Sequence, residues 1–479
     1  MICVFSCTIE GIDALEVQIE IDIRTGLPSF DIVGLPGATV RESRERVRAA
    51  IINSGFEFPL QRITVNLAPA DIRKDSSVFD LPIALGILAA QKLISENIFE
   101  SFLIVGELSL NGNLRTIKGS LSFAELSNKH NKTLLLPASN IQEAQAISKC
   151  KAIPLNNLRQ AVAFLTNQIA ILPPQLQPRR LSPKLERPFA EIHGQFTAKR
   201  VLQIAAAGHH HTLLIGSPGT GKTILARNTA FIMPPMTEEE AITTSKIYSS
   251  CGKLDPKLGI MQERPFRSPH HSITRTGLIG GGQPIVPGEI TLAHNGILLL
   301  DELLEFKHDA LQALREPLET KEIVLSRAGQ SIVFPADFLL IATANPCPCG
   351  NLGHPSKNCV CQPSDIKRYT RKLIGPLLDR IDLVAFLKPL KPDEYLSLVN
   401  EPTYTVTQRT VGIDLPLTPE AKTFLSQAVD KLHISARGYY KVIRVAKTIA
   451  NLDEESEIRP AHLAEALQYR WESVRIYPD

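Results

Sequence analysis

The chain of 479 residues lacks several features that mark special classes of protein. Its most apolar stretch, near LPIALGILAAQKL, is too short to span a bilayer, so we expect no membrane association. Its start, MICVFSCTIEGIDALE, has no basic region before an apolar stretch and does not resemble a signal peptide. The net charge is only +3, so composition alone neither indicates nor excludes a nucleic-acid partner.

Cysteines are few outside one short segment. Four of the eight, Cys3, Cys7, Cys150 and Cys251, are mostly scattered singly along the chain. This pattern favours a reducing compartment over a disulfide scaffold, so we expect a cytoplasmic protein. With 44% hydrophobic residues, the chain is long enough for two or three domains and a sizeable core.

Composition and periodicity predict a multidomain α/β protein in four segments. Residues 1–171 alternate between strand and helix patterns, namely ALEVQIEIDI, ATVRESRERVRAAIINSG and RITVNLAP. Residues 172–190 contain LPPQLQPRRLSPKLERP, whose five prolines and several charges predict a linker. Residues 191–390 read as an α/β core. Residues 391–479 form the last segment, in which the stretch from LTPEAKTFLSQAVDKL to the end has apolar side chains three and four positions apart, which predicts helices.

The strongest motif is GSPGTGKT, which fits the phosphate-binding pattern G-x-x-x-x-G-K-[ST]. An apolar run, HTLLI, precedes it, and a helical pattern, TILARNTAFI, follows. The glycines let backbone amides face phosphate oxygens at a helix N-terminus. We expect Lys222 to reach the β- and γ-phosphates of ATP and Thr223 to help hold Mg²⁺. The predicted nucleotide-binding residues are Gly216, Ser217, Pro218, Gly219, Thr220, Gly221, Lys222 and Thr223.

Two further apolar strands end in polar residues. GILLLDE ends in Asp301, which suits Mg²⁺ coordination, and Glu302, which suits the general base that deprotonates the attacking water. DFLLIATAN ends in Asn345, placed to hold that water near the γ-phosphate. The predicted activity is therefore ATP hydrolysis.

The segment NPCPCGNLGHPSKNCVCQP contains the remaining cysteines, Cys347, Cys349, Cys359 and Cys361. Four thiolates suit a tetrahedral zinc ion, and a closed metal site would stiffen a loop that is too polar to form a core. The C-x-C spacing departs from the usual C-x₂-C, and His354 is an alternative fourth ligand. Redox-sensitive disulfides and plain reduced thiols remain open as alternatives.

The spacing of the three strand ends resembles the AAA+ superfamily. Longer stretches resemble the magnesium-chelatase-like ATPases of the YifB/ComM type over nearly the whole chain. The similar stretches are RPFRSPHHS, LQALREPLETKEIVLSRAG, ATANPCPCG and GPLLDRIDL, with IVGLPGATVRESRERVRAAIINSGF and ITVNLAPADIRKDSSVFDLPIALGILAA in the first segment. The resemblance implies an AAA+ core with a C-terminal helical lid, and a ring that is a homo-hexamer. It also implies helicase or branch-migration activity on branched or forked DNA during natural transformation or recombination.

The resemblance assigns further residues. Arg380, in LLDRID, resembles an arginine finger that reaches the neighbouring subunit's γ-phosphate, and Arg437 resembles a lid arginine. The stretch 272–290 resembles an insertion hairpin facing a pore, and Arg327 lies where a second pore hairpin would turn. Either these hairpins contact DNA phosphates or they are ordinary hairpin tips, and the two alternatives are equal at this point.

The first segment resembles the Lon protease proteolytic domain, an α+β fold of the ribosomal S5 domain 2-like class. The catalytic serine and lysine positions of the Lon domain correspond here to Val78 and Leu121, so we expect a non-catalytic platform. A shifted alignment would instead recruit Ser77 and Lys118. Two other functions compete with a DNA motor: a chelatase motor that drives metal insertion through a partner, and a protein-remodelling adaptor.

Overall fold

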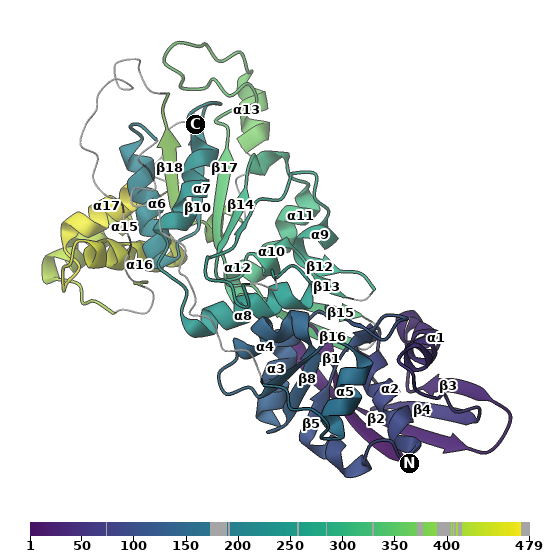
Figure 1. Cartoon of the computed structure of the whole chain (residues 1–479). Helices are drawn as coiled ribbons and strands as arrows, with labels where there is room; N and C mark the ends of the chain where they lie inside the picture. The colour runs from purple at the N-terminus through teal and green to yellow at the C-terminus, as the bar shows by residue number, and fades with distance from the viewer. Residues whose placement is uncertain are drawn as a thin grey trace. The chain divides into compact units, whose positions relative to one another are not determined.

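The computed structural model describes residues 1–72, 74–172, 189, 192–255, 258–283, 285–327, 330–370, 377–389, 404, 406, 409–410 and 414–470 (Figure 1). For Arg327 and Gln330 it describes the backbone only. The chain forms two compact units. The first contains Met1–Arg180, Thr237–Met261 and Gln283–Val286, and the second contains Leu181–Met236, Gln262–Gly282 and Pro287–Asp479. The predicted linker lies almost entirely outside the described residues, and the four predicted segment boundaries remain predictions.

The first unit combines two main sheets with helices. One sheet has the strand order β1-β2-β4-β3, in which β3 runs parallel to β4 and the other pairs are antiparallel; the second is parallel, with the order β5-β8-β9. The strands are β1 (Ile2–Glu10), β2 (Asp13–Arg24), β3 (Ser29–Val33), β4 (Arg62–Ala68), β5 (Phe102–Ile104), β6 (Glu107–Leu108), β7 (Leu114–Arg115), β8 (Thr133–Pro137) and β9 (Ala152–Leu155). The helices are α1 (Ala38–Asn53), α2 (Asp80–Ala90), α3 (Ser120–Lys129), α4 (Ile141–Gln145), α5 (Leu158–Leu165) and α8 (Glu238–Ser250).

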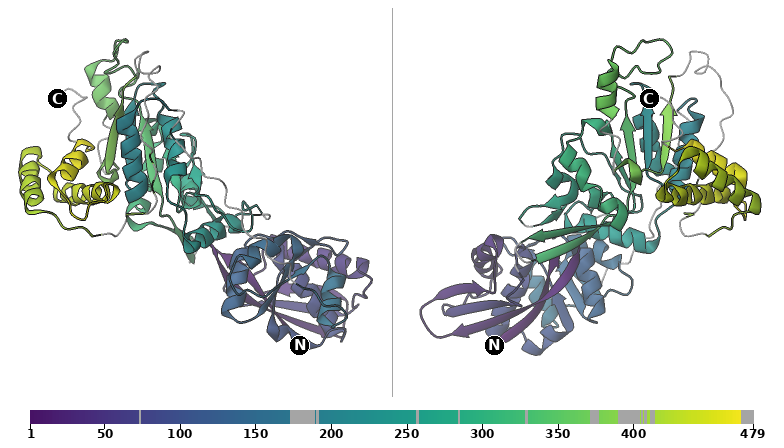
Figure 2. Two further views of the ribbon diagram at one scale, coloured as in Figure 1. Left: turned by 60° about the vertical axis from the view of Figure 1, so that its left-hand side comes forward. Right: turned by 180° about the vertical axis from the view of Figure 1, so that it is seen from behind.

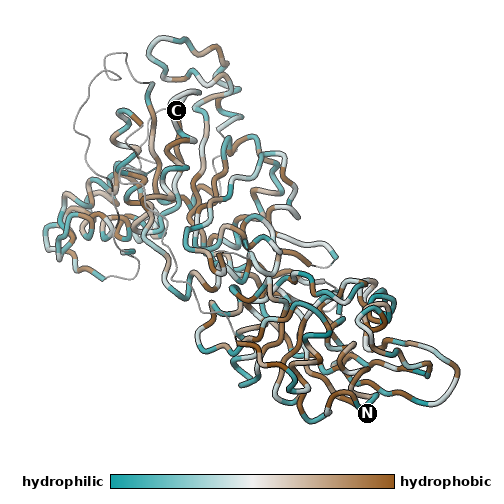
Figure 3. The backbone as a smooth tube through the Cα atoms, viewed as in Figure 1, coloured by the Kyte–Doolittle hydropathy of each residue, from teal (hydrophilic) through white to brown (hydrophobic). Residues whose placement is uncertain are grey.

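The alternation in β2 decides which face of its sheet is buried. Val17, Ile19 and Ile21 are fully buried, whereas Gln18 between them is exposed. The buried face packs on α2, whose first ten residues are all buried. Gly86 permits this contact, because a Cβ there would lie 2.0 Å from Cδ1 of Ile21. The strands and helix predicted in this part of the chain are therefore confirmed, and Figure 3 shows apolar residues along them.

Helix α8 belongs to the first unit, although its sequence follows the phosphate motif. Thr237 and Glu240 begin it with a reciprocal capping box. Lys246 then lies 2.6 Å from carboxylate oxygens of Asp13 and of Glu125, which anchors the helix to the unit. This placement was not predicted from the sequence, because nothing local to 237–261 distinguishes the segment from its neighbours in the chain.

Glu143 makes the docking of α8 sensitive to pH. Its carboxylate is 4% exposed and accepts a hydrogen bond of 2.8 Å from Ser249. Burial raises the pKa of Glu143 from 4.5 to about 7, against the opposing bonds from Ser249 and Asn140. The folded state therefore holds this proton more tightly than the unfolded state does. Its stabilisation is complete below about pH 4.5 and is lost as the pH rises through about 7.

We expect Glu143→Gln to weaken this dependence, because glutamine retains the shape and an oxygen acceptor but does not titrate. The free energy of unfolding of the first unit falls from pH 5 to pH 8, and this decrease should be smaller in the variant than in the wild type by up to about 3 kcal/mol. Urea unfolding at the two pH values measures this difference. Glu57→Gln, at an exposed position, is the matched control and should behave as wild type. Parallel pH profiles for Glu143→Gln and wild type would contradict the argument.

The second unit is built on a five-stranded sheet of order β11-β14-β17-β10-β18, in which every neighbouring pair is parallel. Short two-stranded ladders join β12 to β13 and β15 to β16. The strands are β10 (Thr212–Gly216), β11 (Phe266–Arg267), β12 (Gly280–Gly281), β13 (Val286–Pro287), β14 (Ile297–Leu300), β15 (Glu322–Arg327), β16 (Gln330–Pro335), β17 (Leu339–Ala344) and β18 (Leu383–Leu387).

Helices cover this sheet and complete its core (Figure 2). α6 packs on β18, β10 and α7, and α16 packs on α6, so buried residues of the C-terminal helices join one core with those of the strands. The helices are α6 (Phe196–Gly208), α7 (Lys222–Ile232), α9 (Arg275–Ile279), α10 (Glu289–Leu292), α11 (His308–Ala313), α12 (Pro317–Thr320), α13 (Pro363–Thr370), α15 (Pro419–Leu432), α16 (Ala436–Leu452) and α17 (Pro460–Gln468).

The predicted fold class is confirmed at the level of a mixed α/β, multidomain protein with parallel sheets. The C-terminal helices predicted from apolar spacing are present as α15, α16 and α17. Within the described ranges, every helix is too short or too polar to serve as a membrane crossing.

Candidate nucleotide site

The candidate site lies where three neighbouring parallel strands end. The order β14-β17-β10 places side by side the strands that precede Asp301, Asn345 and the loop after Gly216. The carboxyl ends of parallel strands meet at one edge of a sheet, where α/β proteins bind their ligands. The structure therefore brings together the three motifs that the sequence analysis assigned to one nucleotide site.

The phosphate loop leaves open space where phosphates would lie. Gly219 and Gly221 have φ angles of 84° and 87°, which favour glycine, and a Cβ on either would meet nothing within 4 Å. α7 begins at Lys222, so its unpaired amides and the positive end of its dipole face the loop. The residues present thus fit a bound polyphosphate.

Lys222 bends over this loop. Its Nζ donates to the carbonyl oxygens of Gly216 at 2.6 Å and Ser217 at 3.0 Å, and to Oδ1 of Asn345 at 3.3 Å. Burial lowers the pKa of Lys222, while the two carboxylates that follow β14 act in the opposite direction. The bond to Asn345 links the phosphate loop directly to the end of β17.

Asp301 is held between two hydroxyl groups. Thr223 Oγ1 donates to its Oδ2 at 3.0 Å, and Thr343 Oγ1 donates to its Oδ1 at 2.5 Å. Thr343 also accepts the backbone amide of Glu302 at 3.0 Å, so it positions both acidic residues. A threonine hydroxyl beside a carboxylate supplies oxygen ligands that suit Mg²⁺. The sequence analysis missed Thr343, because a β-branched residue inside a buried strand is usually a packing residue.

Glu302 follows β14 in an uncommon backbone conformation. Its φ of 55° is uncommon for a residue other than glycine, and backbone strain of this kind concentrates at functional sites. Its side chain is 57% exposed, as a base that contacts water requires. His271 Nδ1 lies 4.0 Å from Glu302 Oε2, a neighbour that the sequence analysis did not identify. It comes from the motif RPFRSPHHS.

The two predicted arginines meet at a different place, in a cavity of about 550 Å³ within the second unit. Arg380 Nη2 lies 3.0 Å from Oε1 of Glu319, and Arg437 bonds to the same oxygen. These bonds, first that of Arg437 and then that of Arg380, lower the pKa of Glu319. Lys441 and Arg444 also line the cavity, so several cations face it.

A buried carboxylate fixes the helix that carries Arg437. Asp382, 2% exposed, lies 2.7 Å from Arg444 Nη2 and 3.1 Å from Lys441 Nζ, both in α16. Burial alone would raise the pKa of Asp382, but His210, Arg444 and Lys441 hold it well below its usual range. The Lys441 side chain is 12% exposed, and removing one partner of such a buried pair is strongly destabilising, so this pair attaches α16 to the start of β18.

The register of β10 and β18 separates the two clusters. These strands pair in parallel from Thr212 with Leu383 to Gly216 with Leu387. The phosphate loop leaves at the Gly216 end, whereas Arg380 precedes the Leu383 end. The four steps from one end of this pairing to the other span about 13 Å. Arg380 is therefore placed away from the phosphate loop of its own chain.

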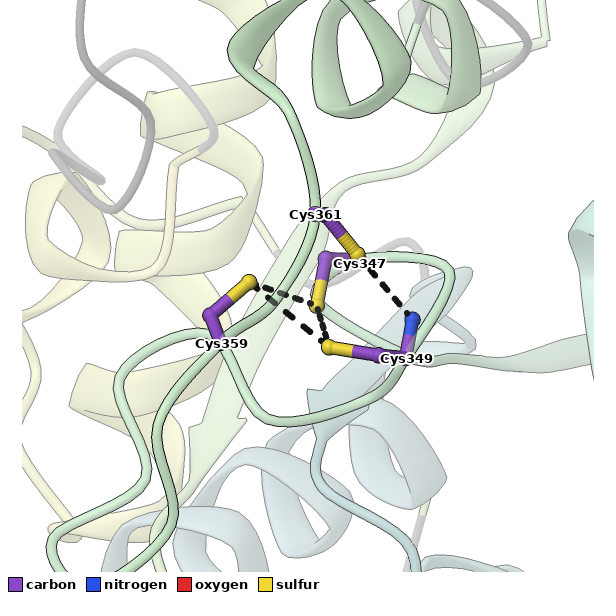
Figure 4. A group of neighbouring side chains, drawn as sticks. All are labelled: Cys347, Cys349, Cys359 and Cys361. Carbon is purple, nitrogen blue, oxygen red and sulfur yellow. Dashed lines mark hydrogen bonds between the residues drawn. The ribbon is translucent and has the colours of Figure 1, made fainter.

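The four cysteines of the segment after β17 converge (Figure 4). Their sulfur atoms all lie within 4.8 Å of one another. His354, the alternative ligand, is outside this group, and its Nδ1 accepts the amides of Ser356 and Lys357, each at 3.1 Å. The structure thus assembles the four cysteines that the sequence analysis grouped.

The two predicted hairpins are present as backbone structure. Arg327 is the last residue of β15 and pairs with Gln330 of β16, so the two strands of the predicted hairpin pair as far as this position. The Arg327 side chain lies outside the described part of the structure. Within 272–290, β12 and β13 form the other ladder. Contact of either hairpin with DNA remains a prediction.

In the first unit, the positions assigned to a protease pair are apolar and buried. Val78 is 3% exposed and Leu121 is fully buried. Ser77 donates a hydrogen bond to Glu107, and the stem of Lys118 lies against Gly252, where a Cβ would approach Cε to 2.8 Å. The shifted Ser77–Lys118 alternative therefore has no support in these contacts.

A parallel α/β sheet with a phosphate loop, an acidic strand end and a polar strand end defines a P-loop nucleotide site. Family models for magnesium chelatase match most of the chain: "Magnesium chelatase, subunit ChlI" at 188–395, "Subunit ChlI of Mg-chelatase" at 19–140, and "Magnesium chelatase, subunit ChlI C-terminal" at 399–470. The chain belongs to this family and is of the YifB/ComM type, which confirms the predicted resemblance.

The YifB and ComM relatives match it along nearly their whole length, whereas a chelatase subunit matches only part of it. The uncharacterized protein YifB of Salmonella typhimurium is 40% identical, over 96% of this chain and 95% of its own. The competence protein ComM of Haemophilus influenzae is 39% identical, over 98% of this chain and 97% of its own. The magnesium-chelatase 38 kDa subunit of Rhodobacter capsulatus is 26% identical, over 38% of this chain and 56% of its own.

Proposed function

We propose that this chain is an ATP-hydrolysing AAA+ motor that assembles into a ring, a hexamer, and migrates branched or forked DNA. The observation that carries the proposal is the joint presence of the assembled nucleotide site and similarity to the competence protein ComM over 98% of the chain. The first unit then serves as a non-catalytic platform with a Lon-like fold, and the C-terminal helices serve as the lid.

Each residue of the nucleotide site has a role in this proposal. Lys222 contacts the β- and γ-phosphates once they displace its bonds to loop carbonyls, while Thr223 and Asp301 hold Mg²⁺. Bound Mg²⁺ neutralises charge on the phosphates. Glu302 accepts a proton from the attacking water, and Asn345 orients that water.

The ring follows from the position of Arg380. An arginine finger must reach a γ-phosphate, yet Arg380 lies at the opposite end of β18 from its own phosphate loop. A neighbouring subunit that docks on the 550 Å³ cavity would bring its nucleotide to Arg380 and Arg437. Each active site is then completed by the next copy of the chain.

The share of the chain that each relative covers favours DNA over the alternative substrates in this proposal. The similarity to the competence protein ComM includes both units, whereas the chelatase subunit of Rhodobacter capsulatus aligns with only 38% of this chain. With a net charge of +3, the basic contacts to DNA must be local, and the β15–β16 hairpin ending at Arg327 is the candidate. A chelatase-like or protein-remodelling motor is the alternative that the experiment must separate.

The test is strand exchange on a four-way DNA junction, together with DNA-stimulated ATPase activity. We expect ATP-dependent branch movement that a non-hydrolysable analogue does not support, and binding that weakens steeply with salt. Arg327→Ala should reduce DNA stimulation, leave basal hydrolysis nearly intact, and lower the slope of log affinity against log salt by about 1. Arg459→Ala, an exposed lid position, is the control. Absence of junction binding at low salt would favour the chelatase or remodelling motor.

A further inference from the structure

We propose that the four cysteines of Figure 4 bind one zinc ion, and that this ion holds the segment 345–361 against the phosphate loop. Zinc binding is independent of the proposed function. The positioning of the phosphate loop rests on the nucleotide site proposed above.

The separations between the sulfur atoms fit one shared ion. Cys347 Sγ lies 3.4 Å from Cys349 Sγ and 3.6 Å from Cys359 Sγ, and Cys349 Sγ lies 3.6 Å from Cys359 Sγ. Four sulfurs at about 2.3 Å from one tetrahedral zinc are about 3.8 Å apart. A disulfide requires about 2.05 Å, much less than any of these distances. An iron–sulfur cluster distributes the four thiolates over two or four irons, so at least some of the sulfur atoms would lie further apart than around one ion.

Backbone amides supply the complementary charge. A zinc ion with four thiolates carries two excess negative charges, and the displaced protons pass to solvent. The amide of Cys349 donates to Cys361 Sγ at 3.4 Å, and the amide of Leu352 donates to Cys347 Sγ at 3.3 Å. Such N–H groups stabilise thiolate ligands and fix their direction. Both N–H groups already donate to the sulfur atoms, so zinc binding requires no change of the backbone there.

The outer part of the segment has no apolar core of its own. None of residues 351–358 is buried, and Val360, between two ligands, is 81% exposed. Tight turns close the loop: the amide of Gly350 donates to Cys347 O at 2.9 Å, and that of His354 to Asn351 O at 3.0 Å. A metal ion substitutes for the missing apolar core in small polar loops of this kind.

Two contacts connect this segment to the nucleotide site. Asn345, which accepts a bond from Lys222, is only two residues before the ligand Cys347. Gly350, between two ligands, packs on the phosphate loop so closely that a Cβ would lie 2.6 Å from Cδ of Pro218. Fixing Cys347 and Cys349 on one ion therefore fixes both neighbours of the phosphate loop.

Zinc content of the full-length protein tests the metal site. We expect one zinc per chain after purification without added metal, and four more of the eight cysteines reacting with a thiol reagent after chelation. Cys359→Ser should lose the zinc, and Cys251→Ser, half-buried outside the cluster, should keep it. If Cys359→Ser fails to fold, Co²⁺ exchange into the wild type replaces it, with tetrahedral thiolate absorption expected. Protein that binds neither ion, or that contains iron, overturns the proposal.

Alanine variants of two glycines distinguish an effect on the position of the phosphate loop from an effect on the folding of the segment. Gly350 and Gly353 have similar φ angles of 78° and 75°, so alanine strains both equally, but a Cβ on Gly353 meets nothing within 4 Å. We expect Gly350→Ala to weaken ATP binding on the order of tenfold with zinc retained, and Gly353→Ala to leave it nearly unchanged. Equal effects would overturn the coupling. Wild type that binds zinc but no ATP would instead overturn the proposed function.

Discussion

Glu302→Gln is expected to lower steady-state ATP hydrolysis by about 10²–10⁴-fold while ATP binding remains close to wild type. Glutamine keeps the size of the side chain but cannot accept the proton of the attacking water. The groups proposed to contact phosphate and metal, Lys222, Thr223 and Asp301, should keep their bonds, because Thr343 fixes position 302 through its backbone amide. Phosphate release and binding of a fluorescent ATP analogue measure the two quantities separately.

Two companion variants define the expected pattern. Lys222→Ala should lose binding as well as hydrolysis, because its ammonium group is the proposed contact to the phosphates. Glu305→Gln, an exposed carboxylate three residues along the chain, should behave as wild type. Unchanged turnover in Glu302→Gln would remove this residue as the base and direct attention to His271, which lies 4.0 Å from it.

Local sequence was sufficient for the elements that carry the nucleotide site. Apolar runs identified all three strands: the run before the phosphate-loop motif predicted β10, and two runs that end in polar residues predicted β14 and β17. Parallel strands bring those ends to one edge, so the assembly of Lys222, Asp301 and Asn345 followed from topology alone.

Contacts between distant segments were not accessible in this way. Thr343, Glu319 and Gly350 act by meeting residues far away in sequence, and each belongs to a residue type that is common in ordinary strands, helices and turns. The docking of α8 in the first unit depends on Lys246 and Glu143 finding partners there. A single sequence records the residues but not these partners.

Arg380→Ala is expected to lower ATP hydrolysis by about 10³–10⁵-fold, the effect of removing an arginine that stabilises the transition state for phosphoryl transfer. The position of Arg380 relative to β18 implies that the lost contact is with a neighbouring subunit's nucleotide. ATP binding to each chain should therefore persist. Arg380→Lys should restore part of the activity, because it keeps the charge but not the planar fork.

Mixing variants distinguishes a finger from a structural residue. A ring that contains both Arg380→Ala and Glu302→Gln chains has some interfaces where an intact Arg380 faces an intact Glu302. The mixture should then hydrolyse ATP faster than either variant alone. Arg368→Ala, at an exposed position in α13, is the control for a general effect of substitution, and it should hydrolyse ATP without a second variant in the mixture. Loss of activity in Arg380→Ala without recovery in the mixture would indicate that its bonds to Glu319 and to the Arg315 carbonyl only support the fold. Sedimentation that finds only monomers with ATP and DNA present would contradict the ring itself.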